Sequence, residues 1–318
     1  MGTVIDSHFL GLTAIVTVGY QFLFFIVTAL LKFHKVTYFA DSTNFAIIAI
    51  LTLILKGTWK FRQIVLTSLV FIWCLRRVLF LFTWFHFLEL TPQILRILRL
   101  RQYTCLDYLC RNFVKLAFGI LQAVWVWTII LPVTVLNSSS RNPSLQAVDI
   151  VGWIMWSVGS LLEAIADQQK LVFTNSLENR GRWCNVGLWQ YSRHPNYFGK
   201  ILLWWGIFVA STPVLEGAEW LVILGPIFLT LLLHLFVTSI PFLECILEEK
   251  VAEINTLCCS PLILLPPAVY GNLPLWFKAT FCCNLPQIDS NSVSNANVLE
   301  ANDSVATYYI YVCGALLL

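Results

Sequence analysis

The chain has 318 residues, of which 58% are hydrophobic and only 12% are charged, and its mean hydropathy is +0.76. A soluble domain of this length is closer to half apolar and one quarter charged, so the excess apolar surface must face lipid. The net charge of +3 is too small to indicate a nucleic-acid partner, and no basic stripe with interleaved aromatic residues supports one.

Apolar segments recur along the chain at lengths suited to membrane crossing, which requires about 20 residues in a helix. The first segment, residues 8–31, lacks a basic leading region and a small-residue cleavage site, so we expect a spanning helix and not a signal peptide. Further apolar segments cover residues 44–55, 64–88, 114–136, 148–165, 201–209 and 215–240. The sequence therefore predicts an all-α fold, a multi-pass transmembrane helical bundle of about six or seven helices.

Several features interrupt this apolar pattern. Arg76 and Arg77 lie within one segment, and we expect their long side chains to extend from a helix end to the interface. Residues 95–111 carry four arginines and predict a cytoplasmic connection at the interface. The Gly225–Pro226 pair is expected to break the last segment, and the Asn/Ser-rich residues 289–304 predict disorder.

The ten cysteines are scattered along the chain. They form no C-x-x-C motif, and the five histidines do not lie near them at zinc-ligand spacing. We therefore expect reduced thiols that fill apolar sites, and no metal site.

The first group of candidate functional residues lies where the segment over residues 148–165 becomes polar. Glu163, Asp167 and Lys170 are spaced by four and three residues, so a helix would place them on one face. Because they follow an apolar helix, they point to a protein interior or to a wet mouth of the bundle. A solvated helix end with an internal ion pair is the alternative interpretation.

Residues 181–206 concentrate charged, aromatic and turn-forming residues in an otherwise apolar chain. Pro195 suits the first turn of a helix that begins near Asn196, and such a helix would aim its first backbone N–H groups at an anion. Arginine and lysine side chains nearby could hold phosphate groups: Lys170, Arg180, Arg182 and Arg193. An interfacial aromatic belt with positive loop charge is the alternative interpretation.

The order of residues in this stretch is specific. GLWQYSRHPNYFG, residues 187–199, closely resembles the signature of the steroid 5-alpha-reductase-like membrane family. That superfamily includes sterol C=C reductases and isoprenylcysteine carboxyl methyltransferases, and the DUF1295 branch is the most similar. The resemblance covers roughly residues 43–287 and is also strong at ADQQK, residues 166–170, and at residues 260–278. We therefore divide the chain into an N-terminal membrane helix and loop (1–42), the steroid-reductase-like membrane domain (43–287) and a divergent, disordered tail (288–318).

The resemblance implies an NADPH-dependent oxidoreductase of the endoplasmic reticulum membrane that reduces a C=C bond of a steroid-like or other lipid enone. It implies a cytoplasm-facing cofactor pocket whose contacts come from the polar stretch and the signature: Asp167, Lys170, Arg180, Arg182, Trp183, Arg193, His194, Asn196 and Tyr197. During conjugate reduction the carbonyl oxygen gains negative charge and needs a hydrogen-bond donor. Tyr191, Glu163 and Glu244 are the candidates for this catalytic role.

Two alternatives stay open. The superfamily signature also serves methyltransferases that use S-adenosylmethionine and act on a lipid or a prenylated cysteine. The second alternative is a degenerate, non-catalytic paralogue. Two departures support it: relatives usually carry an acid where this chain has Lys200, and the segment around residues 245–267 is shorter than in relatives. Lys200 either anchors a cofactor phosphate or replaces a useful acid, and the basic residues nearby favour the second interpretation.

Overall fold

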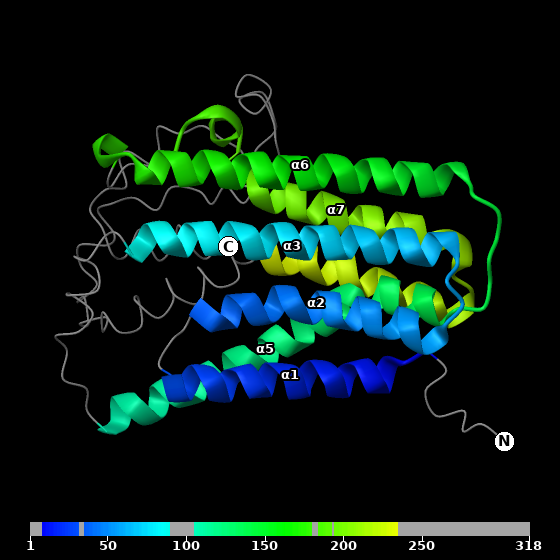
Figure 1. The fold of residues 1–318 in the computed structure, drawn as a ribbon, viewed down its shortest axis with the longest axis horizontal. Helices are drawn as coiled ribbons and strands as arrows, with labels where there is room; N and C mark the ends of the chain where they lie inside the picture. The colour runs from blue at the N-terminus through cyan, green and yellow to red at the C-terminus, as the bar shows by residue number, and fades with distance from the viewer. Residues whose placement is uncertain (1–7, 32–34, 90–104, 180–183, 193, 235–318) are drawn as a thin grey trace, which may run out of the picture. The chain divides into compact units, whose positions relative to one another are not determined.

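The computed structural model describes residues 8–31, 35–89, 105–179, 184–192 and 194–234. Six long α-helices make up most of these ranges, and Figure 1 shows them: α1 (Leu10–Leu31), α2 (Lys35–Lys56), α3 (Phe61–Glu89), α5 (Cys105–Ser138), α6 (Ala147–Asn175) and α7 (Pro195–Ser211). Short 3-10 helices connect or extend them: η2 (Leu177–Asn179), η3 (Gly187–Gln190), η4 (Thr212–Val214) and η5 (Gly217–Ile223). The α-helical conformation then continues over residues 224–234.

Six helical segments of the described chain are long and apolar enough to cross a membrane: Leu10–Val27, Phe39–Lys56, Phe61–Thr83, Gly119–Ser138, Ala147–Asn175 and Gly217–His234. Their side chains leave many large apolar groups exposed, which is the arrangement that a lipid solvent requires. The predicted multi-pass helical bundle is therefore confirmed. The helices are long because a chain that crosses hydrocarbon must satisfy every backbone polar group within itself.

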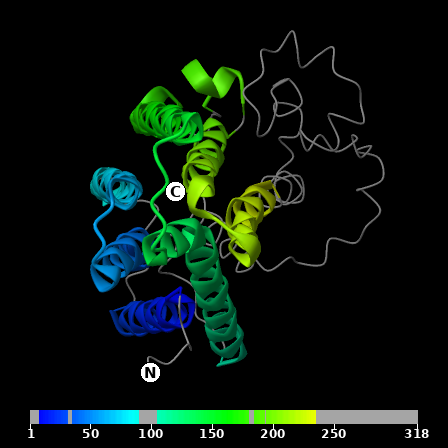
Figure 2. The ribbon, with the colours of Figure 1, turned by 90° about the vertical axis from the view of Figure 1, so that its right-hand side faces the viewer.

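The chain divides into two compact units. The first contains the described residues up to Ser157 together with Leu203–Leu229, and the second contains Val158–Leu202 and the described residues from Thr230. Helices α6 and α7 each contribute one part to both units. Seen end-on in Figure 2, α1, α2 and α3 of the first unit form a row in chain order, and α2 packs against α1, α3 and α5.

Aromatic side chains fill the interior of the first unit. Phe45 of α2 lies 5.5 Å from Trp73 of α3, 6.0 Å from Trp125 of α5 and 5.2 Å from Trp204 of α7, measured between ring centroids. Most of these pairs meet edge to face, a geometry that contributes about 0.5–1.5 kcal/mol per pair beyond the burial of area. Four helices are thus held together through a single phenylalanine.

A buried ion pair connects the beginnings of α3 and α6. The Arg62 guanidinium donates to both carboxylate oxygens of Asp149, from Nε at 2.6 Å and from Nη2 at 2.8 Å. It also donates to the carbonyl oxygens of Pro143 and Ser144, each at 3.3 Å. The backbone N–H of Gln146 donates to Asp149 at 2.9 Å, so the same carboxylate also caps α6.

One expectation about the apolar segments was wrong. Arg77 does not reach the interface: its side chain is buried, and the guanidinium carbon lies 5.3 Å from the centroid of the Trp73 ring.

The Gly225–Pro226 pair marks a change of helix type in the last segment, because the 3-10 helix η5 ends at Ile223 and α-helix begins at Leu224. Proline is tolerated there because it lies in the first turn after η5, where its missing N–H has no intrahelical partner to lose. A Cβ at Gly225 would lie 2.7 Å from the Thr128 carbonyl oxygen, so glycine allows α5 to approach closely.

Candidate functional site

The candidate site lies in the second unit, where the later half of α6 meets the beginning of α7. Glu163, Asp167 and Lys170 all belong to α6, which confirms that they share one continuous helix. The side chain of Glu163 is fully buried and that of Asp167 is 5% exposed, while Lys170 is half-buried. The alternative of a solvated helix end therefore does not describe the two carboxylates.

Helix α7 begins where the sequence predicts. Pro195 is its first residue, and the His194 backbone N–H donates to the Ser192 hydroxyl at 3.2 Å. The His194 carbonyl oxygen accepts from the N–H groups of Tyr197 and Phe198, at 3.1 and 3.4 Å. These donors are already engaged, so the beginning of α7 offers an anion fewer free N–H groups than expected.

A carboxylate–amide contact joins the two helices. The Asn196 side-chain N–H donates to Asp167 Oδ1 at 3.3 Å, and Asn196 Oδ1 accepts from the Tyr197 backbone N–H at 3.1 Å. Both side chains are buried, with exposed fractions of 4% for Asn196 and 5% for Asp167. The amide is therefore oriented by the helix that carries it, and it presents its donor to the carboxylate of α6.

Aromatic rings flank this contact. The rings of His194 and Tyr197 stack with a centroid separation of 4.7 Å and an interplanar angle of 15°. Lys200 is buried on the same helix, and its Nζ lies 5.7 Å from the Tyr197 ring centroid. Such a position over a ring face is favourable for a cation.

A second cation lies over a ring where the 3-10 turn η3 folds back on α6. The Lys170 Nζ lies 5.3 Å from the Trp189 ring centroid, and the Trp189 indole N–H donates to the Ala166 carbonyl oxygen at 3.0 Å. The Leu188 backbone N–H donates to Gln169 Oε1 at 2.9 Å. The ADQQK segment and the GLWQ segment, which the sequence leaves 16 residues apart, are therefore in contact.

Glycines permit the close approach of these elements. A Cβ at Gly199 would lie 2.6 Å from the backbone N of Glu163 and 2.6 Å from the carbonyl oxygen of Gly159, so α7 rests directly on the α6 backbone. Gly187 has a φ of +60°, which a residue with a side chain rarely adopts, and a Cβ there would collide with Gln169. Both glycines belong to the GLWQYSRHPNYFG stretch, and close packing against α6 explains why a side chain does not fit at either position.

The structure brings together some of the predicted site residues and not others. Asp167, Asn196, His194 and Tyr197 converge, whereas Tyr191 is 41% exposed. The remaining candidates lie outside the described residues: Arg180, Arg182, Trp183, Arg193 and Glu244. Sequence reasoning gave no role to Gln169 or to Trp189, although both belong to the segments that carry the resemblance.

Cys184 lies beside this region and is half-buried with a free thiol. Burial raises the pKa of the Cys184 thiol above its usual value, and this outweighs the effects of the Val186 backbone and the Lys170 charge, which lower it. The thiol therefore stays protonated at neutral pH, and Cys184 lacks the activation that a nucleophilic cysteine needs.

Comparison with protein families matches residues 24–255 to the family model described as a protein of unknown function (DUF1295). The chain belongs to the DUF1295 family. Among curated proteins nothing matches the chain, and no solved structure matches it. The family carries no activity in its description, so a function for this member must be argued from its own residues.

Proposed function

We propose that this DUF1295 protein is an NADPH-dependent membrane oxidoreductase that reduces a C=C bond conjugated to a carbonyl group in a steroid-like or other lipid. One observation carries the proposal: the buried Asp167–Asn196 contact joins the two segments in which the sequence most resembles steroid 5-alpha-reductase-like proteins. A buried polar contact in an apolar protein has a cost, and it is retained where it organises a binding site or a helix contact.

The residues of the site fit a dinucleotide cofactor. The Asp167 carboxylate can accept from sugar hydroxyl groups, and the Asn196 amide can both donate and accept. The stacked His194 and Tyr197 rings offer a flat face to a planar group. Lys170, with the arginines expected at positions 180, 182 and 193, supplies charge for phosphates. When bound, NADPH would supply the hydride.

Burial ranks the candidates for the hydrogen-bond donor to the developing oxyanion. A donor acts most strongly in a site from which water is excluded. Glu163 is fully buried, whereas Tyr191 is 41% exposed. We therefore assign the donor role to Glu163 in its protonated form, ahead of Tyr191.

The charge of the sequence supports a site that faces the cytoplasm. Residues 176–194, which lead into the signature, include Arg180, Arg182 and Arg193. Because positively charged connecting sequences tend to remain in the cytoplasm, we propose that the cofactor site opens to that side. Residence in the endoplasmic reticulum stays a prediction.

Thermal unfolding of the detergent-purified protein tests the cofactor. A ligand that binds only the folded state stabilises it by about 2.7 kcal/mol at a hundred times its Kd. We expect NADPH to raise the melting temperature, and S-adenosylmethionine to leave it unchanged. Stabilisation by S-adenosylmethionine alone would instead support the methyltransferase alternative. Stabilisation by neither compound would support a non-catalytic paralogue. A panel of lipid enones, assayed by NADPH consumption, then tests the reaction.

A further inference from the structure

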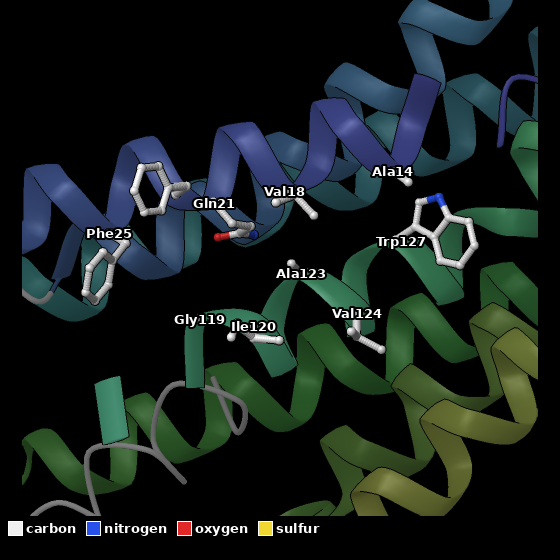
Figure 3. A pocket seen from close by; sticks show the side chains of 10 residues that line it. Ala14, Val18, Gln21, Phe25, Gly119, Ile120, Ala123, Val124 and Trp127 are labelled. Atoms are coloured by element: carbon white, nitrogen blue, oxygen red, sulfur yellow. The ribbon is translucent and has the colours of Figure 1, made fainter. Parts of the chain in front are cut away.

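A pocket of about 230 Å³ lies between α1 and α5 in the first unit, and none of its lining residues belongs to the candidate site (Figure 3). Ten residues line it, and Gln21 is the only one with a polar side chain apart from the Trp127 indole. The Trp127 N–H is already engaged, because it donates to the Thr13 hydroxyl at 3.2 Å. An apolar cavity of about 150 Å³ already suffices to bind a benzene molecule, so this pocket has room for part of an apolar ligand.

Asp41, which does not line the pocket, fixes the orientation of the Gln21 amide. Its side-chain N–H donates to Asp41 Oδ1 at 2.9 Å, and the Gln122 amide donates to Asp41 Oδ2. In the structure the nitrogen of the Gln21 amide therefore faces Asp41. The Gln21 carbonyl oxygen is therefore directed away from Asp41, and no donor in the described part of the chain reaches it.

Gln21 is 5% exposed and lies in a membrane-spanning segment. Hydrocarbon offers no donor to a polar acceptor, and an acceptor left unpaired there is costly. The pocket therefore combines an apolar lining with one acceptor that needs a donor. Its lining on α1 extends from Ala14 to Phe25, a length of about 16 Å at 1.5 Å per residue, and Gln21 lies between these limits. The pocket is elongated, with apolar surface on both sides of the acceptor.

We propose that this pocket binds a bilayer lipid that carries a hydroxyl group part-way along an apolar chain. The chain fills the groove between α1 and α5, and the hydroxyl donates to the Gln21 carbonyl oxygen. A ketone or an enone has no hydrogen to donate, so the pocket does not suit the carbonyl end of the proposed substrate. The lipid site is thus chemically distinct from the candidate reductase site, and it does not depend on the proposed function.

Matched photoreactive lipids test the site on the whole protein in vesicles. The probe is a long-chain diazirine lipid with a mid-chain hydroxyl, and the controls are its O-methyl ether and the chain without the hydroxyl. One hydrogen bond to a neutral group predicts a preference of roughly three- to tenfold for the hydroxyl probe over the ether. Crosslinks should map to α1 and α5. Equal labelling of the wild type by all three lipids would overturn the proposal.

Three variants test which residues cause the preference for the hydroxyl probe. Gln21→Leu should remove it, whereas Gln122→Leu, which also takes a donor from Asp41 but does not line the pocket, should keep it. Gly119→Leu should reduce labelling by all three probes, because a Cβ at Gly119 has nothing within 4 Å and a larger side chain can fill the pocket. A preference that survives Gln21→Leu, or full labelling of Gly119→Leu, contradicts the assignment. If Gln21→Leu does not fold, Gly119→Leu alone decides.

Discussion

Two carboxylates of α6 lie in contrasting surroundings, although one helix carries both. Asp149, in the first turn, accepts hydrogen bonds of 2.6 and 2.8 Å from the cationic Arg62 and a third of 2.9 Å from a backbone N–H. Asp167, further along the helix, accepts a 3.3 Å hydrogen bond from the neutral amide of Asn196 and interacts electrostatically with Lys170. Both side chains are buried to a similar extent, with exposed fractions of 0% and 5%.

The difference separates a structural charge from a candidate functional one. A bidentate arginine–carboxylate pair that also bonds two backbone carbonyls fixes the positions of two helices and a loop. The Asn196 amide is neutral and its hydrogen bond to Asp167 is longer, so a ligand can replace or extend this one contact at a smaller cost. Mutations at the two ends of α6 should therefore affect different measurements: stability at Asp149, and ligand affinity at Asp167.

The largest effect is expected from breaking the structural pair. Arg62→Met leaves the Asp149 carboxylate buried without its cation, which typically costs about 3–5 kcal/mol of stability. Thermal unfolding in detergent measures the loss. The double variant Arg62→Met/Asp149→Leu is the control, because replacing both charges removes the unpaired group and should recover much of the stability. A single variant as stable as the wild type would show that the pair contributes little.

Asp167→Asn tests the candidate functional carboxylate of this comparison. It keeps the shape of the side chain but removes the charge that we assign to the cofactor, so NADPH affinity should fall by about 1.5–3 kcal/mol, the range for hydrogen bonds to charged groups. The melting temperature without ligand should change much less than it does in Arg62→Met. Titration of NADPH into both proteins measures the affinities. An unchanged affinity in a folded Asp167→Asn protein removes Asp167 from the binding site.

Gly199→Ala tests how closely α7 rests on α6. The new methyl group would meet two backbone atoms at 2.6 Å, and backbone cannot move aside as a flexible side chain can. Overpacking of this kind costs about 1–3 kcal/mol, and it should lower both the melting temperature and NADPH affinity because α7 carries the signature residues. Gly19→Ala is the matched control, since nothing lies within 4 Å of its Cβ. Equal effects of the two substitutions would mean that helix propensity, and not the contact, is responsible.

The membrane helices could be predicted from the sequence because hydropathy and length directly reflect the bilayer. The beginning of α7 at Pro195 was also predictable, since proline has a local preference for the first helical turn. The same local logic indicated a break at Gly225–Pro226, and there the 3-10 helix η5 gives way to α-helix at Leu224. Local rules succeed where no distant contact competes with them.

Contacts between distant residues could not be predicted. The sequence offers no sign that Arg62 pairs with Asp149, 87 residues later, because neither residue is part of a recognisable motif. The contact of Arg77 with Trp73, four residues earlier on α3, is local, but its burial depends on the helices that pack against α3, which the sequence does not identify. In the candidate site, one helical face was predictable for Glu163, Asp167 and Lys170, but the partner of each side chain was not. Gln169 and Trp189 gave no signal beyond their place in the resemblance.

The smallest effect is expected at Lys200, for which the structure suggests a second role. The sequence favours the view that this lysine replaces a useful acid, and this view stays a prediction. Its side chain is buried, and its Nζ lies 5.7 Å from the ring of Tyr197, which stacks on His194. A cation in this position favours one orientation of the aromatic pair, at about 0.5–2 kcal/mol.

Lys200→Met keeps the apolar stem but removes the charge, so the aromatic pair should lose part of its order. We expect NADPH affinity to fall about three- to tenfold, since a factor of ten corresponds to about 1.4 kcal/mol. Lys200→Arg should retain most of the affinity, because it keeps a cation that can lie over the ring. Lys200→Glu places an anion near the electron-rich face of Tyr197 and should bind NADPH most weakly of the three. A gain of affinity or turnover in Lys200→Glu would restore the first interpretation, in which an acid at this position completes the site and the lysine impairs it.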